Sequence, residues 1–160
     1  MGIVEGREVI ASRVEVALRW LLGGLFIYAG VLKVLDPGAF AQDIANYQLV
    51  SWPVAVAGGL YLPWLEIFAG GALVFGPGRG GALRILLFLM LLFLQALFAA
   101  WMRGLNIHCG CFGTAFATSN YALLFLRDLA LLTGLGWLLW REWKRRIAEE
   151  KAEEESSVKR

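Results

Sequence analysis

The hydrophobic positions of this chain fall into four long runs, separated by short polar stretches. Each run is roughly 20 residues long, the length that an α-helix needs to cross a hydrocarbon core of ~30 Å. The stretches between them contain proline and glycine, which end helices and form turns. The pattern therefore predicts an all-α integral membrane four-helix bundle, with spans at about 13–34, 53–75, 83–102 and 121–141.

Three shorter segments complete the predicted organisation. Residues 1–12 form a short N-terminus, predicted to be an interfacial turn or a fraying helix, and residues 142–160 form a charged helical tail. Between the first two spans, Phe40, Ile44 and Tyr47 recur every three to four residues. This spacing predicts a short amphipathic helix that lies on the membrane surface, either over the loop after the third span or on lipid headgroups.

The composition agrees with a membrane protein of one domain. The chain has 160 residues, 59% of them hydrophobic, and a mean hydropathy of +0.63, values far above those of soluble globular domains. Lipid is therefore its first partner, and nothing in the sequence indicates a nucleic-acid partner. Most of the tryptophans fall at predicted span ends, as in an aromatic belt: Trp20, Trp52, Trp101, Trp137, Trp140 and Trp143.

The basic residues indicate an orientation. Those that flank the first span, the second loop and the end of the fourth span would lie on one side: Arg7, Arg13, Arg19, Arg79, Arg84, Arg141, Lys144, Arg145 and Arg146. The first and third loops offer only Lys33 and Arg103. The positive-inside rule thus predicts that both termini are cytoplasmic, in the cytoplasmic (inner) membrane, and that the third loop is extracytoplasmic.

The third loop contains the only histidine and the only two cysteines, His108, Cys109 and Cys111. An extracytoplasmic location allows a disulfide to form and persist. A Cys-Gly-Cys disulfide closes a very small ring, and strained, exposed disulfides exchange readily. His108 and Arg103 add positive potential that favours a reactive thiolate. We therefore expect Cys109, Cys111 and His108 to be the catalytic residues.

Other uses of this motif are open to different degrees. A structural disulfide is a poor explanation, because so short a loop constrains little of the unfolded chain. His108, Cys109 and Cys111 are soft metal ligands, but they supply only three groups at close spacing, so we predict no metal site. A c-type haem site is excluded, because it needs Cys-x-x-Cys-His.

Five polar residues in or near the spans form a second candidate site. Glu66 lies in the middle of a span, where a carboxylate is costly unless it is paired, and Arg127 is the partner we expect. Asp128 would be free to meet Lys33 or a ligand, although the helix-end position of Lys33 favours an interfacial lysine. Gln95 most simply packs helices together. A quinone is a possible cofactor near Glu66, Arg127 and Gln95, and a purely structural ion pair is the alternative.

Taken together, these motifs resemble the MauE branch of the DoxX-like membrane proteins. The resemblance covers about residues 18–140 and rests on Gly30, Lys33, Asp36 and Pro37, then Phe40 and Tyr47, then Leu62, Pro63 and Glu66, then the Cys-Gly-Cys-Phe-Gly loop and Arg127-Asp128. It implies a four-helix membrane protein with a redox-associated role on the outer face. MauE is implicated in maturing the disulfide-rich small subunit of methylamine dehydrogenase, and DoxX relatives are linked to thiosulfate:quinone oxidoreduction.

The leading hypothesis is a membrane thiol-disulfide redox protein. Cys109 and Cys111 would exchange electrons with an extracytoplasmic thioredoxin-like or cysteine-containing protein. Because the chain has one cysteine pair, the circuit needs a quinone, another cofactor or a partner subunit, in a homo- or hetero-oligomer. The alternative is a non-enzymatic membrane anchor or assembly factor for a redox or metal partner, and direct thiosulfate oxidation is a weaker third.

Overall fold

The computed structural model describes residues 2–76, 78–104 and 121–158. Its elements are α1 (Gly2–Leu35), α2 (Pro37–Asn46), α3 (Trp52–Phe75), α4 (Arg79–Met102) and α5 (Tyr121–Val158). Four of these helices contain apolar stretches long enough to cross a membrane: Ser12–Leu35, Trp52–Phe75, Arg79–Met102 and Ala122–Ser157. The prediction of an all-α fold with four long apolar helices is confirmed.

The helix ends differ from the predicted ones mainly at the N-terminus. Helix α1 begins at Gly2, so the segment expected to be a turn or a fraying helix continues the first span. The charged tail extends α5 to Val158 without a break, as its composition predicted. Helix α4 begins at Arg79, directly after the turn that follows α3.

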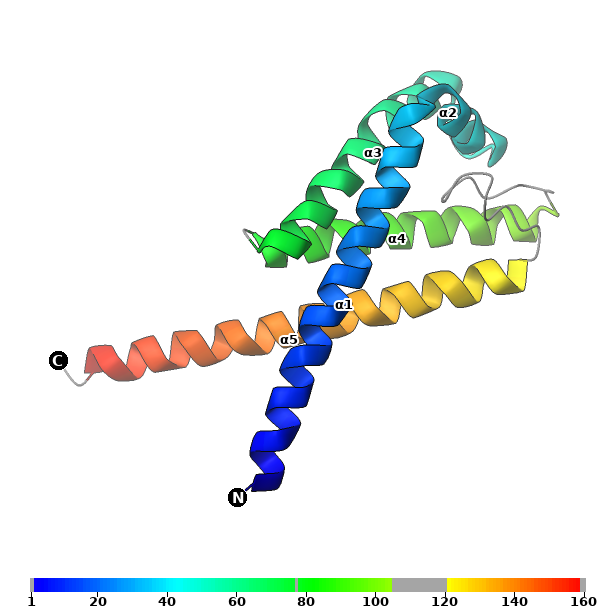
Figure 1. Cartoon of the computed structure of the whole chain (residues 1–160). Helices are drawn as coiled ribbons and strands as arrows, with labels where there is room; N and C mark the ends of the chain where they lie inside the picture. Colours follow the sequence, from blue (N-terminus) through cyan, green and yellow to red (C-terminus); the bar gives the residue numbers. More distant parts are fainter. Residues whose placement is uncertain (1, 77, 105–120, 159–160) are drawn as a thin grey trace.

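The long helices form two antiparallel pairs that cross each other (Figure 1). In the first pair, α1 and α3 lie side by side, with α2 at the end where the chain passes from one to the other. In the second pair, α4 and α5 run along each other across the first pair. All four long helices supply buried apolar side chains to one core, which includes Leu22, Phe26, Ala69, Leu73, Leu86, Met90, Leu135 and Leu138.

Small residues bring α1 and α3 into close contact. A Cβ atom added to Gly23 would lie 2.8 Å from the carbonyl oxygen of Gly70, and one added to Gly30 would lie 2.8 Å from the carbonyl oxygen of Pro63. Such separations are shorter than real Cβ contacts. The two backbones can therefore approach this closely only because glycine occupies these positions.

Helix α2 packs against α3. Asp36 caps its first turn, with one carboxylate oxygen accepting a hydrogen bond from the backbone N–H of Ala39 at 2.9 Å. The helix buries Phe40 and Ala41, and a Cβ added to Gly59 of α3 would lie 2.9 Å from the Cβ of Ala41. The predicted short helix is thus present, and its apolar side faces the protein.

Gly23→Ala should destabilise the protein, while Gly24→Ala should not. The new methyl of Gly23→Ala would meet a backbone carbonyl and the side chain of Val74 at 2.5 Å, which forces α1 and α3 apart. Overpacking of this kind typically costs about 1–3 kcal/mol. Nothing lies within 4 Å of the same position at Gly24, so alanine there should be neutral or stabilising. Thermal unfolding of both variants in one detergent measures the difference. Equal melting temperatures would contradict the proposed close contact.

Candidate functional site

A buried ion pair joins α1 to α3. The Nζ atom of Lys33 lies 2.6 Å from Oε1 and 2.7 Å from Oε2 of Glu66, so one ammonium group binds both carboxylate oxygens. The side chains are only 4% and 3% exposed. Charges buried to this extent are tolerated only when they are paired and hydrogen-bonded.

The pairing follows from the antiparallel contact of the two helices. Glu66 is close to level with Gly30, because a Cβ added to Gly30 would lie 3.3 Å from the Cβ of Glu66. Lys33 lies about one turn, ~5 Å, beyond that level. Side chains on a helix point towards its N-terminus, and the N-termini of α1 and α3 lie at opposite ends. The two side chains therefore extend towards each other and close the gap.

Two aromatic rings enclose the lysine. Its Nζ lies 4.9 Å from the ring centre of Phe40 on α2 and 5.0 Å from that of Phe93 on α4. The two rings contact each other, with centres 6.4 Å apart. The negative faces of the rings stabilise the ammonium group by about 0.5–2 kcal/mol per contact. Lys33 thus ties together α1, α2, α3 and α4.

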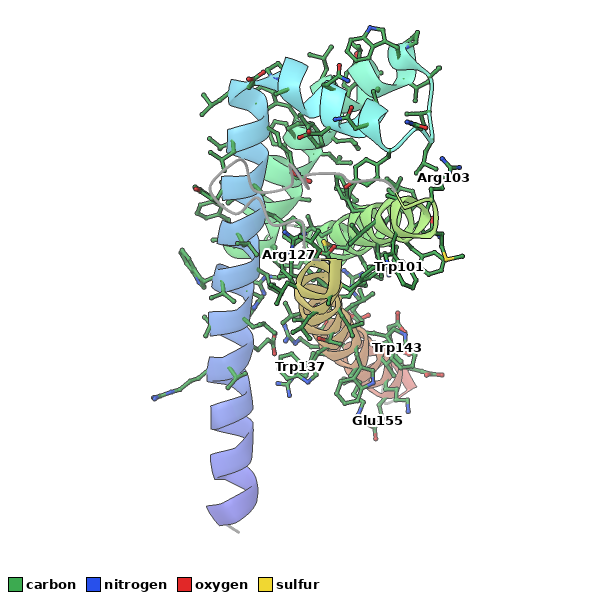
Figure 2. The ribbon with its side chains drawn as sticks, turned by 90° about the vertical axis from the view of Figure 1, so that its right-hand side faces the viewer. Trp101, Arg103, Arg127, Trp137, Trp143 and Glu155 are labelled. Atoms are coloured by element: carbon green, nitrogen blue, oxygen red, sulfur yellow. The ribbon has the colours of Figure 1, made fainter. Side chains whose placement is uncertain are left out.

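A second ion pair lies on α5. The Nε and one terminal nitrogen of Arg127 lie 2.8 Å and 2.7 Å from Oδ1 of Asp128. Asp128 is buried, at 3% exposure, and the Arg127 side chain is 27% exposed. Figure 2 shows Arg127 on the first part of α5.

Both ion pairs face one cavity between the long helices. Its charged lining is Lys33, Glu66, Arg127 and Asp128, and its apolar lining is Phe26, Ala29, Met90, Phe93 and Leu131. The space that a water centre can occupy is about 20 Å³, which accommodates about one water molecule. The two cations and two anions have no net charge together. The arrangement can therefore hold and orient a water molecule, or pass a proton between its own groups, without a change in the net charge of the cluster.

The expected pairing of these residues was wrong. Glu66 binds Lys33 instead of Arg127, and Asp128 binds Arg127. The interfacial position favoured for Lys33 was also wrong, because the residue is 5% exposed and lies under Phe40. The cause is that α2 packs beside the end of α1, so that Phe40 covers the ammonium group of Lys33.

Four of the five expected cofactor residues thus meet in one place, and Gln95 does not join them. Gln95 is exposed on α4 and does not line the cavity. Phe93 was not among the expected site residues, because in the sequence it is one apolar residue among many in α4. Phe40 was noted only for its helical spacing and its part in the family motif.

The catalytic candidates His108, Cys109 and Cys111 lie outside the described residues. The structure describes the end of α4, which precedes these residues, and the start of α5, which follows them. These two helix ends are held together. The Arg103 guanidinium, at the end of α4, donates a hydrogen bond to the backbone oxygen of Gln48 at 3.1 Å. Figure 2 shows Arg103 beside the chain that follows α2. A buried cluster also joins these ends: Tyr47, Leu97, Ala100 and Leu124.

These features define a small all-α multi-pass membrane protein with a buried, charge-balanced ionic cluster among its helices. Residues 11–141 match the family described as Methylamine utilisation protein MauE. Since the match spans most of the chain, the protein belongs to the MauE family, as its motifs suggested. Comparisons with curated proteins and with solved structures found no match.

Removing either partner of the Lys33–Glu66 pair should destabilise the protein strongly. Lys33→Met or Glu66→Leu leaves an uncompensated buried charge, which costs about 3–5 kcal/mol. The double variant removes both charges and should lose much less than the sum of the single changes. Unfolding of the four proteins in detergent gives the coupling energy, with Lys151→Met on the exposed tail as the control. Additive losses would contradict a direct pair.

Proposed function

We propose that this protein is a thiol-disulfide redox protein of the cytoplasmic membrane, in which Cys109 and Cys111 exchange electrons with an extracytoplasmic protein. The observation that carries the proposal is the joining of the two helix ends that flank the cysteine segment. Arg103 and the buried cluster around Tyr47 fix α4 and α5 to the end of α2. These joined helix ends form a platform from which the cysteine segment leaves and to which it returns in the chain, and such support favours a reactive site.

The charge distribution supports placing this platform on the outer side. Lys33 is occupied by Glu66 inside the protein, so it does not count as a loop charge. Of the two basic residues in the first and third loops, Lys33 and Arg103, only Arg103 then remains as a loop charge. Arginines gather at the opposite helix ends. The positive-inside rule favours cytoplasmic termini for this distribution. An outer location exposes the cysteines to an oxidising compartment.

The reaction is a two-electron exchange. A thiolate of the partner's dithiol attacks the Cys109–Cys111 disulfide and forms a mixed disulfide, while the other cysteine leaves as a thiolate and takes up a proton. The partner's second thiol loses its proton and displaces the mixed disulfide, which leaves the partner oxidised and Cys109 and Cys111 as a dithiol. A membrane quinone, as the oxidant, would accept the two electrons and two protons of this dithiol as the disulfide forms again.

The ionic cluster would support this chemistry as a proton-handling and positioning site. Its cavity accommodates about one water molecule, so a quinone ring does not enter it in this conformation. Asp128 lies about two turns from Tyr121, where α5 begins after the cysteine segment. We assign Lys33, Glu66, Arg127 and Asp128 to this role. Gln95 is exposed on the outer surface of α4, where a membrane quinone could contact it.

The family supplies the biological setting of the proposal. Its description refers to methylamine utilisation, and we expect the partner to be a thioredoxin-like or cysteine-containing protein of such a system. The non-enzymatic alternative, an anchor or assembly factor, predicts the same membrane location but no turnover of the cysteine pair.

Alkylation of the cysteines in native membranes tests turnover. After mild reduction, Cys109 and Cys111 should both react with a mass-shifting maleimide, and added quinone should restore the protected, unshifted form. Glu66→Gln, compared at equal amounts of folded protein, should slow this reoxidation on the order of 100-fold or more, as loss of a group that transfers protons does. Gln95→Leu measures the contribution of an uncharged polar residue outside the cavity, and Cys109→Ser/Cys111→Ser gives the background.

Two results would contradict the proposal. A pair that resists mild reductant would be a structural disulfide, and a pair that stays reduced with quinone but is protected by metal would favour the anchor or assembly factor.

A further inference from the structure

A second polar cluster lies at the other end of α1 and α5. Glu15 is only 5% exposed, and three arginines bind its carboxylate. Arg145 and Arg141 reach it from α5, at 2.5 Å and 3.3 Å, and Arg19 lies 3.4 Å away on α1. These contacts join the first and last helices of the protein.

Two more arginines extend the cluster to the turn between α3 and α4. The Arg79 guanidinium lies against Gly76, and its Nε is buried with no hydrogen-bond partner among the described residues. The Arg146 guanidinium lies against Gly80, where an added Cβ would meet its nitrogen at 2.8 Å. We call the following five residues the arginine cluster: Arg19, Arg79, Arg141, Arg145 and Arg146.

The arginine cluster carries more positive charge than the carboxylates in contact with it neutralise. Among the described residues, the carboxylates within 4 Å of its members are Glu15 and Glu142, the latter 3.5 Å from Arg145 and 3.7 Å from Arg146. Two anions therefore contact five cations among the described residues, and the unbalanced guanidinium groups repel one another. Further along α5, Glu149, Glu150 and Glu153 line a surface pocket with Arg145 and Arg146 and offset charge at that end of the cluster, away from Arg19 and Arg79. A further anion would relieve this repulsion.

The start of α4 adds to the positive potential. Gly78 precedes the helix and provides no side-chain cap. The partial positive charge of a helix N-terminus favours an anion in front of it. Arg79 begins this helix and Arg146 lies against its second residue, so guanidinium groups and helix amides occur together.

The surroundings place the arginine cluster at the level of lipid headgroups. Trp20, Trp140 and Trp143 are 59%, 47% and 57% exposed and come from the same helix segments as the arginines. Figure 2 shows Trp137 and Trp143 along the far part of α5, away from Arg103. Exposed tryptophans at span ends mark the membrane interface. Phe75, the last residue of α3, is 77% exposed and offers an apolar surface beside the turn.

We infer that the arginine cluster binds the phosphate group of an anionic phospholipid. Arginine suits a phosphate because its planar fork donates two parallel hydrogen bonds. Basic pockets between membrane helices are a known mode of headgroup binding. A lipid fits better than a soluble phosphate, because apolar helix surface lies next to the cationic group. This site is separate from the cysteine pair and does not depend on the redox proposal.

Lipid titration of the full-length protein in detergent tests the inference. Phosphatidylglycerol should bind and raise the melting temperature, and phosphatidylcholine with the same acyl chains should have little effect. Arg79→Gln/Arg146→Gln should weaken phosphatidylglycerol binding on the order of tenfold or more, since each basic group near a membrane surface contributes measurably. These two arginines do not bind Glu15, so the contacts of Glu15 that join α1 and α5 remain. Arg84→Gln, which removes an exposed arginine of α4 outside the cluster, is the matched control.

A variant with the opposite expected effect separates binding from misfolding. Glu142→Gln removes the carboxylate next to Arg145 and Arg146, so phosphatidylglycerol should bind several-fold more tightly, which damage to the fold could not produce. The inference is overturned if both lipids bind equally, if the double variant matches Arg84→Gln, or if Glu142→Gln weakens binding. Protection by inorganic phosphate equal to that by phosphatidylglycerol would identify a soluble anion and also overturn it.

Discussion

The bond between Lys33 and Glu66 is the interaction on which the rest of the structure depends. In a hydrocarbon environment neither charge is tolerated alone, so α1 and α3 must bring the two groups together. Their close approach requires the glycines along the contact, and the lysine in turn requires the rings of Phe40 and Phe93. This ion pair thereby holds α1 beside α3, and the two rings around the lysine hold α2 and α4 against them.

The two ends of the molecule have opposite electrostatic character. Towards the helix ends that flank the cysteine segment, the buried charges are balanced in pairs around a cavity that accommodates about one water molecule. At the other end, arginines outnumber carboxylates around Glu15. This asymmetry agrees with a protein that is anchored at a negatively charged membrane surface on one side and performs its chemistry on the other.

The sequence predicted the helices well, because span length and apolar composition are local properties. The family resemblance also followed from short motifs that stand out in the sequence. The partners of the charges could not be predicted in the same way. The position of Glu66 in the sequence gives its depth in the membrane but does not show which helix lies beside it. Arg127 of α5 was therefore expected as its partner, although α1, with Lys33, is the helix that packs against Glu66. The arginines were read one by one as signs of orientation, and only the fold brings them around Glu15.

The central claim, that the cysteine pair is a working redox centre, is tested most directly by a redox titration. The full-length protein would be equilibrated in glutathione buffers of graded potential, and the fractions with free and bonded Cys109 and Cys111 would be measured by intact mass spectrometry. A working redox centre should show a single reversible two-electron transition within the range of these buffers, as strained, exposed disulfides do. A pair that remains entirely oxidised or entirely reduced across the whole range would contradict it.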